Sequence, residues 1–175
     1  ILTDSKGRFS ICRSSKELDN AIGDVFTIPL EENMFCFGQV VDKIRGYTAY
    51  IIYDITSREF SSLKEIMNCK IAFLIFTVDY GVEMRLKDDV WKVIGNCAVP
   101  QIVFPKYKVT IMKNGKNHYM IMNYDGTCVK PATESENNSL SFFESVTPAL
   151  VEGAIRAKFL GHKWDKIYDG IIYQG

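Results

Sequence analysis

The chain has 175 residues, which is long enough for one well-buried core and short for two. Lys+Arg and Asp+Glu both total 21, so the formal net charge is zero. A free-standing nucleic-acid binder usually shows a basic excess, because binding gains from counterion release. We therefore expect a single domain over residues 1–175 and expect no nucleic-acid partner.

The cysteines and the hydropathy pattern indicate the cellular compartment in which the protein is expected. Five cysteines are spread along the chain at wide spacing: Cys12, Cys36, Cys69, Cys97 and Cys128. No two of them have the close spacing of a zinc or redox motif, and unpaired buried thiols suit a reducing environment. The longest apolar run, 71–78, is too short to span a bilayer, and no signal peptide opens the chain. We expect a cytoplasmic protein without membrane segment, metal or cofactor.

The first part of the chain reads as β structure. Residues 1–20 are polar and form either a short strand around 9–12 or a loose N-terminal arm, ahead of a β-rich core at 20–130. Three runs rich in β-branched and aromatic residues predict strands: 25–30, 35–41 and 48–54. Pro29 predicts an edge or a strand end, and EEN at 31–33 a turn. Gly38 predicts a bulge or a close backbone approach.

The middle of the chain alternates between helix and strand signals. Residues 57–68 predict a short helix capped by Ser57 or Ser61. The apolar run 71–78 predicts a central strand covered on both faces. A further strand is expected at 91–100, then a hairpin at 106–126 around an Asn-Gly turn, and 130–139 has the composition of a loop.

A C-terminal helix at 146–161 is the best-signalled element. Thr147 is a natural N-cap, Pro148 suits the first helical position and Gly161 ends the run. Strands with two segregated helices indicate an α+β fold, predominantly β: a curled antiparallel sheet or a partly open barrel with a short helix and a C-terminal helix.

No established catalytic motif is present. His118 and His162 have no second ligand at metal spacing, and adjacent carboxylates such as Glu31-Glu32 point to opposite faces of a strand. Trp91 is expected in the core, and Trp164 is expected to pack the tail onto the domain. An unrecognised enzyme stays open as an alternative, in which Asp54, Glu83, His118 and Tyr124 would converge in one cleft.

One polar segment stands out as a candidate partner-binding surface. In DYGVEMRLKDD at 79–89, Tyr80 is the candidate anchor, and the surrounding acids form a charged rim: Asp79, Glu83, Asp88 and Asp89. An aromatic anchor with acidic surroundings suits a basic protein partner. The alternative is an ordinary solvated connection after a buried strand.

Several short stretches together resemble one known family. They are GDVF at 23–26, IPL at 28–30, FGQV at 37–40, YD at 53–54, and WKVIGN at 91–96 with Pro100 and Pro105 following. Over about residues 20–110 this pattern is similar to immunity protein family 26 of bacterial polymorphic toxin systems. The resemblance implies a cytoplasmic, non-enzymatic, mostly β protein that binds and neutralises one cognate toxin domain. If that toxin is a nuclease, its groove is basic and the inhibitor should present acid to it.

The resemblance gives the shared residues a scaffold role: Gly23 and Gly38 for backbone geometry, Pro29 for strand ending and Trp91 for packing.

A small nucleic-acid-binding β-barrel is the second functional hypothesis. It rests on basic residues interleaved with aromatics on one hairpin: Lys106, Tyr107, Lys108, Lys113, Lys116 and Tyr119.

Overall fold

The computed structural model describes residues 2–3, 9–10, 21–59 and 62–175. These residues group into two units. The first comprises the chain up to Pro100 together with Val146–Gln174, and the second comprises Gln101–Ser145. The single domain expected from chain length stays a prediction, because two such units can still unfold together.

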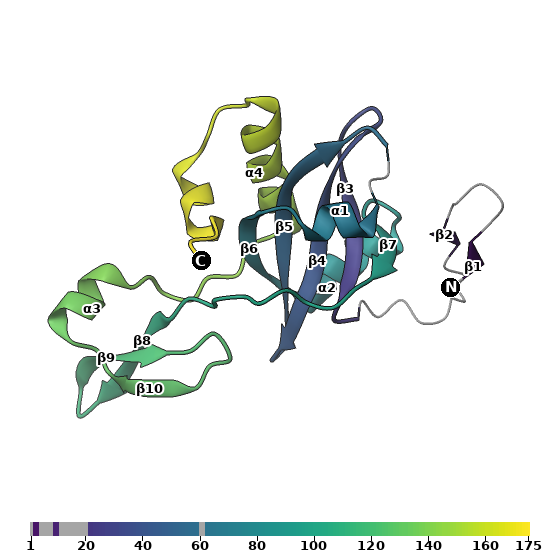
Figure 1. The fold of residues 1–175 in the computed structure, drawn as a ribbon. Coiled ribbons are helices and arrows are strands. Elements are labelled where there is room, and N and C mark those ends of the chain that lie inside the picture. Colours follow the sequence, from purple (N-terminus) through teal and green to yellow (C-terminus); the bar gives the residue numbers. More distant parts are fainter. Residues whose placement is uncertain (1, 4–8, 11–20, 60–61) are drawn as a thin grey trace. The chain divides into compact units, whose positions relative to one another are not determined.

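Five antiparallel strands form the sheet of the first unit, in the order β6-β5-β4-β3-β7 (Figure 1). Their bounds are Asp24–Glu31 (β3), Met34–Ile44 (β4), Tyr47–Ser57 (β5), Ile71–Val78 (β6) and Lys92–Asn96 (β7). Ahead of them, β1 (Leu2–Thr3) pairs with β2 (Phe9–Ser10). The strand expected around 9–12 is thus present at its first two residues, and positions 11 and 12 lie outside the described residues.

The helices of the first unit are α1 (Leu63–Met67), α2 (Asp79–Lys87), α4 (Pro148–Leu160) and the 3-10 helix η1 (Lys166–Ile171). The expected C-terminal helix is confirmed with its Thr147 cap, and Gly161 ends it at a φ of 72°. The predicted cap of the short helix was wrong: Ser62 forms a capping box with Glu65, while Ser57 still belongs to β5. Ser61 lies outside the described residues.

The α+β class with predominant β structure is confirmed, with 41% strand against 25% helix. The sheet is open and does not close into a barrel, so the first of the two expected architectures is the observed one. Gly38 lies at a register shift between β4 and β5. A Cβ on Gly38 would come within 2.6 Å of Cζ of Phe26, so this glycine also allows the expected close approach.

The position expected for the apolar run 71–78 was wrong, because β6 is an edge strand. Segments from the C-terminal part of the chain cover its outer edge. Tyr173 N donates to Ala72 O at 3.1 Å, and Val146 N donates to Phe76 O at 2.9 Å. Ile172 forms an antiparallel bridge with Phe73. The run is apolar because strand, tail and helix bury it on several sides, a situation that hydropathy alone does not distinguish from a central strand.

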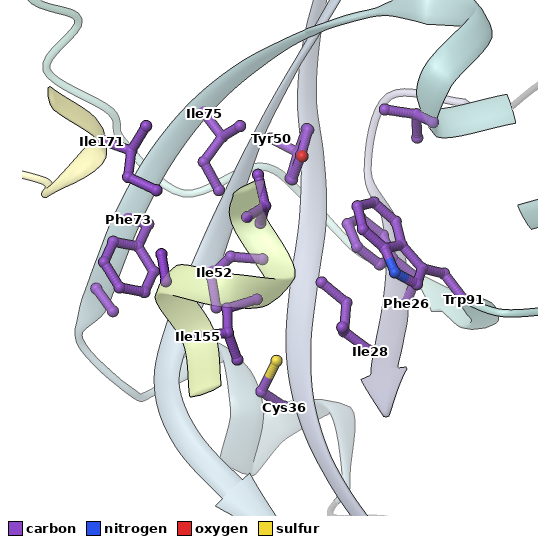
Figure 2. Packing of buried hydrophobic residues seen from close by; sticks show 14 of the residues in the cluster. Phe26, Ile28, Cys36, Tyr50, Ile52, Phe73, Ile75, Trp91, Ile155 and Ile171 are labelled. Atoms are coloured by element: carbon purple, nitrogen blue, oxygen red, sulfur yellow. The ribbon is translucent and has the colours of Figure 1, made fainter. Parts of the chain in front are cut away.

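The main core lies between one face of this sheet and the helices α2 and α4. Val151, Ala154 and Ile155 of α4 are fully buried against strand residues. Figure 2 shows Ile155 beside Ile52, with the rings of Phe26 and Trp91 face to face at one side of the cluster. These two rings stack at 5.3 Å with an interplanar angle of 4°. Trp91 is therefore a core residue, as expected.

The second unit is a three-stranded sheet in the order β10-β9-β8, followed by a short helix. Its elements are β8 (Tyr107–Lys113), β9 (Lys116–Met122), β10 (Cys128–Pro131) and α3 (Glu134–Ser139). The hairpin turn is confirmed, with positive φ at Asn114 and Gly115. The loop expected at 130–139 was wrong, because a capping box between Thr133 and Glu136 starts α3 there.

Candidate functional site

Helix α2 starts directly where the edge strand β6 ends, and its first turn is fixed to the β4–β5 turn. Asp79 N donates to Gly46 O at 3.0 Å. The Thr48 hydroxyl donates to Oδ1 of Asp79 at 2.5 Å. A carboxylate in the first turn also interacts favourably with the helix dipole. Asp79 is thus engaged in holding the helix against the sheet.

The inner face and the far end of α2 are fixed as well. Val82 and Leu86 are buried in the core. Arg85 pairs with Glu152 of α4 through Nε at 3.0 Å and Nη2 at 3.3 Å. The indole N–H of Trp91 donates to Oε1 of Glu152 at 3.1 Å, and this is the oxygen that Arg85 Nε also contacts. A helix held at both ends and along one face presents its outer side chains on a rigid base.

The outer face of α2 carries an exposed apolar pair. Tyr80 is 69% exposed and Met84, one turn later, is 43% exposed. Residues four apart in a helix lie on the same face, so the two side chains are neighbours. Val82 and Leu86 point into the core, which places Tyr80 and Met84 on the outside. We call the exposed side chains of Tyr80 and Met84, together with the half-buried Glu83 beside them, the α2 surface.

The structure places the predicted acids along the whole helix. Asp79 and Glu83 are half-buried and lie in its first half, near Tyr80. Asp88 and Asp89 are exposed and follow its last residue, and Asp88 lies eight residues after Tyr80, roughly 12 Å further along the axis at 1.5 Å per residue. The acids therefore do not form one ring around Tyr80. The solvated connection weighed for 79–89 was wrong, since the segment is a packed helix.

Sequence reasoning missed Met84 as a member of this surface. The signal was present, because Tyr80 and Met84 are spaced at i and i+4 while Val82 and Leu86 repeat the same spacing on the opposite side. Reading 79–89 as a connection hid this two-sided pattern. The helix also carries Arg85 and Lys87 in its last turn, which reduces the net acidity of the segment.

Metal binding and the pair Asp54 and Glu83 are two catalytic arrangements on which the described residues bear. Among them, no group of three or more His, Cys, Asp or Glu is arranged to hold a metal ion. Asp54 pairs with Lys158 at 3.1 Å. Asp54 lies six residues along β5 from Thr48, whose hydroxyl contacts Asp79 in the first turn of α2. Six residues of a strand span roughly 20 Å. Asp54 therefore lies far along β5 from the point where the first turn of α2 contacts that strand.

Cys36 and Cys69 are not activated thiols. Cys36 is fully buried, and burial raises the pKa of its thiol above the ordinary value. Burial also raises the pKa of Cys69, with smaller contributions from Asp54 and Glu65. The fully buried Cys36 packs as a small hydrophobic residue, whereas Cys69 and Cys97 are only half-buried.

The hairpin proposed for nucleic-acid stacking does not gather its aromatics on one face. Tyr107 is opposite Met122, whereas Tyr119 is opposite Thr110. Side chains alternate along a strand, so Tyr107 and Tyr119 point to opposite faces. The Lys108 ammonium is already engaged, donating to Asn137 O at 2.6 Å and lying 4.9 Å from the Phe142 ring centroid. This geometry does not favour a stacking platform.

Three comparisons with known proteins bear on identity. No curated protein matches the chain, and no solved structure matches it. A family model does match, that of immunity protein 26, over residues 21–114. In the part of the chain that the structure describes, no helix is long and apolar enough to cross a membrane.

The matched range holds every strand of the first sheet, α1, α2 and β8. It includes the stretches on which the resemblance was recognised, from GDVF at 23–26 to WKVIGN at 91–96. It also includes the close contact of Phe26 with Gly38 and the α2 surface. Because the match spans more than half of the 175 residues, the chain belongs to the immunity protein 26 family.

Proposed function

We propose that this immunity protein neutralises one cognate toxin domain in the bacterial cytoplasm by binding it directly, with the α2 surface as a principal contact. The observation that carries the proposal is the exposed Tyr80–Met84 pair on α2. It lies in a chain that belongs to a family of immunity proteins. Neutralisation by contact needs a complementary surface and no chemistry of the inhibitor's own.

The rigidity of α2 supports the choice of Tyr80 as anchor. Interface residues that dominate affinity are often Tyr or Trp, and they act best when little conformational entropy is lost on binding. The contacts of Asp79 with Thr48 and of Arg85 with Glu152 hold the helix before any partner arrives. Met84 adds a flexible apolar side chain that adapts to the opposing surface.

The charges near α2 suit a toxin with basic residues around its own binding pocket. Glu83 lies next to the apolar pair, and Asp88 and Asp89 extend the acidic surface at the far end. Acid opposite base speeds the encounter of two proteins and disfavours wrong partners. A nuclease toxin, whose substrate groove must be basic to bind phosphates, is the candidate that this charge fits.

The test is co-expression of the protein with the toxin domain encoded beside its gene, followed by calorimetry on the purified pair. Tyr80→Ala should weaken binding by about 2 kcal/mol or more, as for a hot-spot residue. Ile167→Ala, an apolar side chain 59% exposed on η1, is the matched control and should leave affinity unchanged. The melting temperatures of both variants should stay close to that of the parent, because exposed side chains contribute little packing energy.

Two outcomes would count against the proposal in different ways. If the wild-type protein neither rescues cells nor binds the neighbouring toxin, direct neutralisation is wrong. If the wild-type protein binds but Tyr80→Ala and Met84→Ala both retain full affinity, the toxin contacts another surface.

A further inference from the structure

The outer edge of β8 is a row of backbone groups without a strand partner among the described residues. β8 ends the order β10-β9-β8. At its start, Lys108 N donates outward to Ser141 O at 2.9 Å, next to a parallel bridge with Phe142. Outward-pointing groups alternate along an antiparallel strand, so Thr110 and Met112 also direct their N–H and C=O outward. No described strand covers them there.

Apolar side chains flank this open edge on both faces of the sheet. Ile111 is 40% exposed and Met112 is 76% exposed. Proteins usually protect such edges, as this protein does at β6, where Ile172 and Tyr173 lie along the strand. An unprotected edge of this kind offers the main-chain hydrogen bonds that strand addition uses, and its exposed apolar side chains can pack against those of an added strand.

The charge at this end of the hairpin indicates the kind of strand that fits. Lys113 and Lys116 are opposite each other beside the turn, and both are exposed. Neither forms an ion pair with a described residue. A second copy that paired with this edge in parallel and in register would place Lys113 beside Lys113, which like charges disfavour. A strand with carboxylates near its end would instead pair with them.

We propose that the β8 edge from Val109 to Lys113 takes up an extended, acidic segment of the toxin domain as an added strand. The segment would hydrogen-bond to the backbone of Thr110 and Met112, and its carboxylates would lie near Lys113 and Lys116. This inference rests on the proposed function, because the partner is the same toxin domain, but it concerns a surface separate from α2 in the sequence.

The sharpest test replaces Met112 by proline. Proline removes the outward N–H and is tolerated on edge strands where the N–H faces solvent, so the β8–β9 ladder should persist. Met112→Ala keeps the N–H and removes the same apolar side chain, which makes it the matched control. With the co-expressed toxin domain as probe, Met112→Pro should weaken binding at least tenfold relative to Met112→Ala.

Amide hydrogen exchange gives a readout that a merely structural effect would not produce. The amides of Thr110 and Met112 should exchange fast in the free protein and become protected in the toxin complex. The amide of Ile111, which pairs with His118 across the hairpin, should be protected in both states. Exchange in free Met112→Pro checks that the hairpin is intact, through unchanged protection of Ile111.

The outcomes separate this proposal from the proposed function. Suppose that the wild-type protein binds the toxin and that Tyr80→Ala weakens this binding. If Met112→Pro and Met112→Ala then bind alike, and no new protection appears at Thr110, the added strand is wrong and the proposed function stands. If protection appears at Thr110 with the protein alone at high concentration, the edge pairs with a second copy, which also overturns the inference. Loss of toxin binding by the wild-type protein would overturn both.

Discussion

The indole of Trp91 is completely buried, and its Nε1 donates to Oε1 of Glu152 at 3.1 Å. The same carboxylate accepts from Arg85. The Glu152 side chain of α4 therefore binds both Arg85 in the last turn of α2 and Trp91, the residue directly before β7. Since α2 carries the exposed Tyr80 and Met84, Glu152 positions the α2 surface from the other side of the helix.

Glu152→Ala should lower the free energy of unfolding by about 2–3 kcal/mol, because it leaves the buried Trp91 N–H without an acceptor and Arg85 without its partner. Glu152→Gln keeps an acceptor for the indole and should cost less. Urea unfolding followed by Trp fluorescence measures both. Equal stability of Glu152→Ala and the parent would show that the bond contributes nothing.

Gly38→Ala should destabilise the protein by about 1–3 kcal/mol through overpacking, because the new methyl would lie 2.6 Å from Cζ of Phe26. The matched control is Gly170→Ala, where a Cβ has no neighbour within 4 Å and which should change stability by less than about 0.5 kcal/mol. Thermal unfolding gives the comparison. Combining Gly38→Ala with Phe26→Leu should recover part of the loss if the ring is the cause, and none otherwise.

Replacing Asp88 and Asp89 together by Asn should mainly slow association with the toxin domain and flatten its dependence on salt. Both side chains are exposed, so they act through long-range attraction more than through packed contact. Stopped-flow or surface-based kinetics at several salt concentrations measures the effect. A changed dissociation rate with an unchanged association rate would contradict it.

The second unit should respond to acid through Glu136. Its hydrogen bond from Lys130, with further bonds from Thr133, lowers the pKa of this carboxyl from 4.5 to about 2. A lowered pKa means that the contribution to stability is present above about pH 4.5 and is lost as pH falls towards 2. Glu136→Gln should abolish this difference, and because the group is exposed, high salt should shrink it. Exchange of the α3 amides between pH 2 and 5 checks the prediction.

Much of the fold follows from local signals in the sequence. Pro29 predicted an edge or strand end, and it lies beyond the stretch of β3 that pairs with β7. Thr147, Pro148 and Gly161 predicted the N-cap, the first position and the end of α4, because caps and stops are local chemistry. The hairpin turn at Asn114 and Gly115 was likewise predicted from a local signal, the Asn-Gly pair itself.

The rest depends on contacts between distant residues. Hydropathy showed that 71–78 is buried but not that Ile172 and Tyr173 cover its edge. For the candidate site, Tyr80 is exposed as expected, while its neighbours differ from the prediction. Met84 lies beside Tyr80 because the segment is a helix. The helix is stabilised by burial of Val82 and Leu86 in a core that the strands and α4 largely form, and these are distant in the sequence.

The covering of β6 by the C-terminal segment has a consequence for how the protein is made. A ribosome delivers the IAFLIFTV strand long before Ile172 and Tyr173, with the whole second unit synthesised in between. During that interval an apolar, β-prone edge has no covering strand, which is the condition under which nascent chains aggregate. Residues synthesised well after β6 thus complete the sheet. Truncation ahead of Ile172 should therefore reduce soluble yield even where every residue of the family-matched range is present.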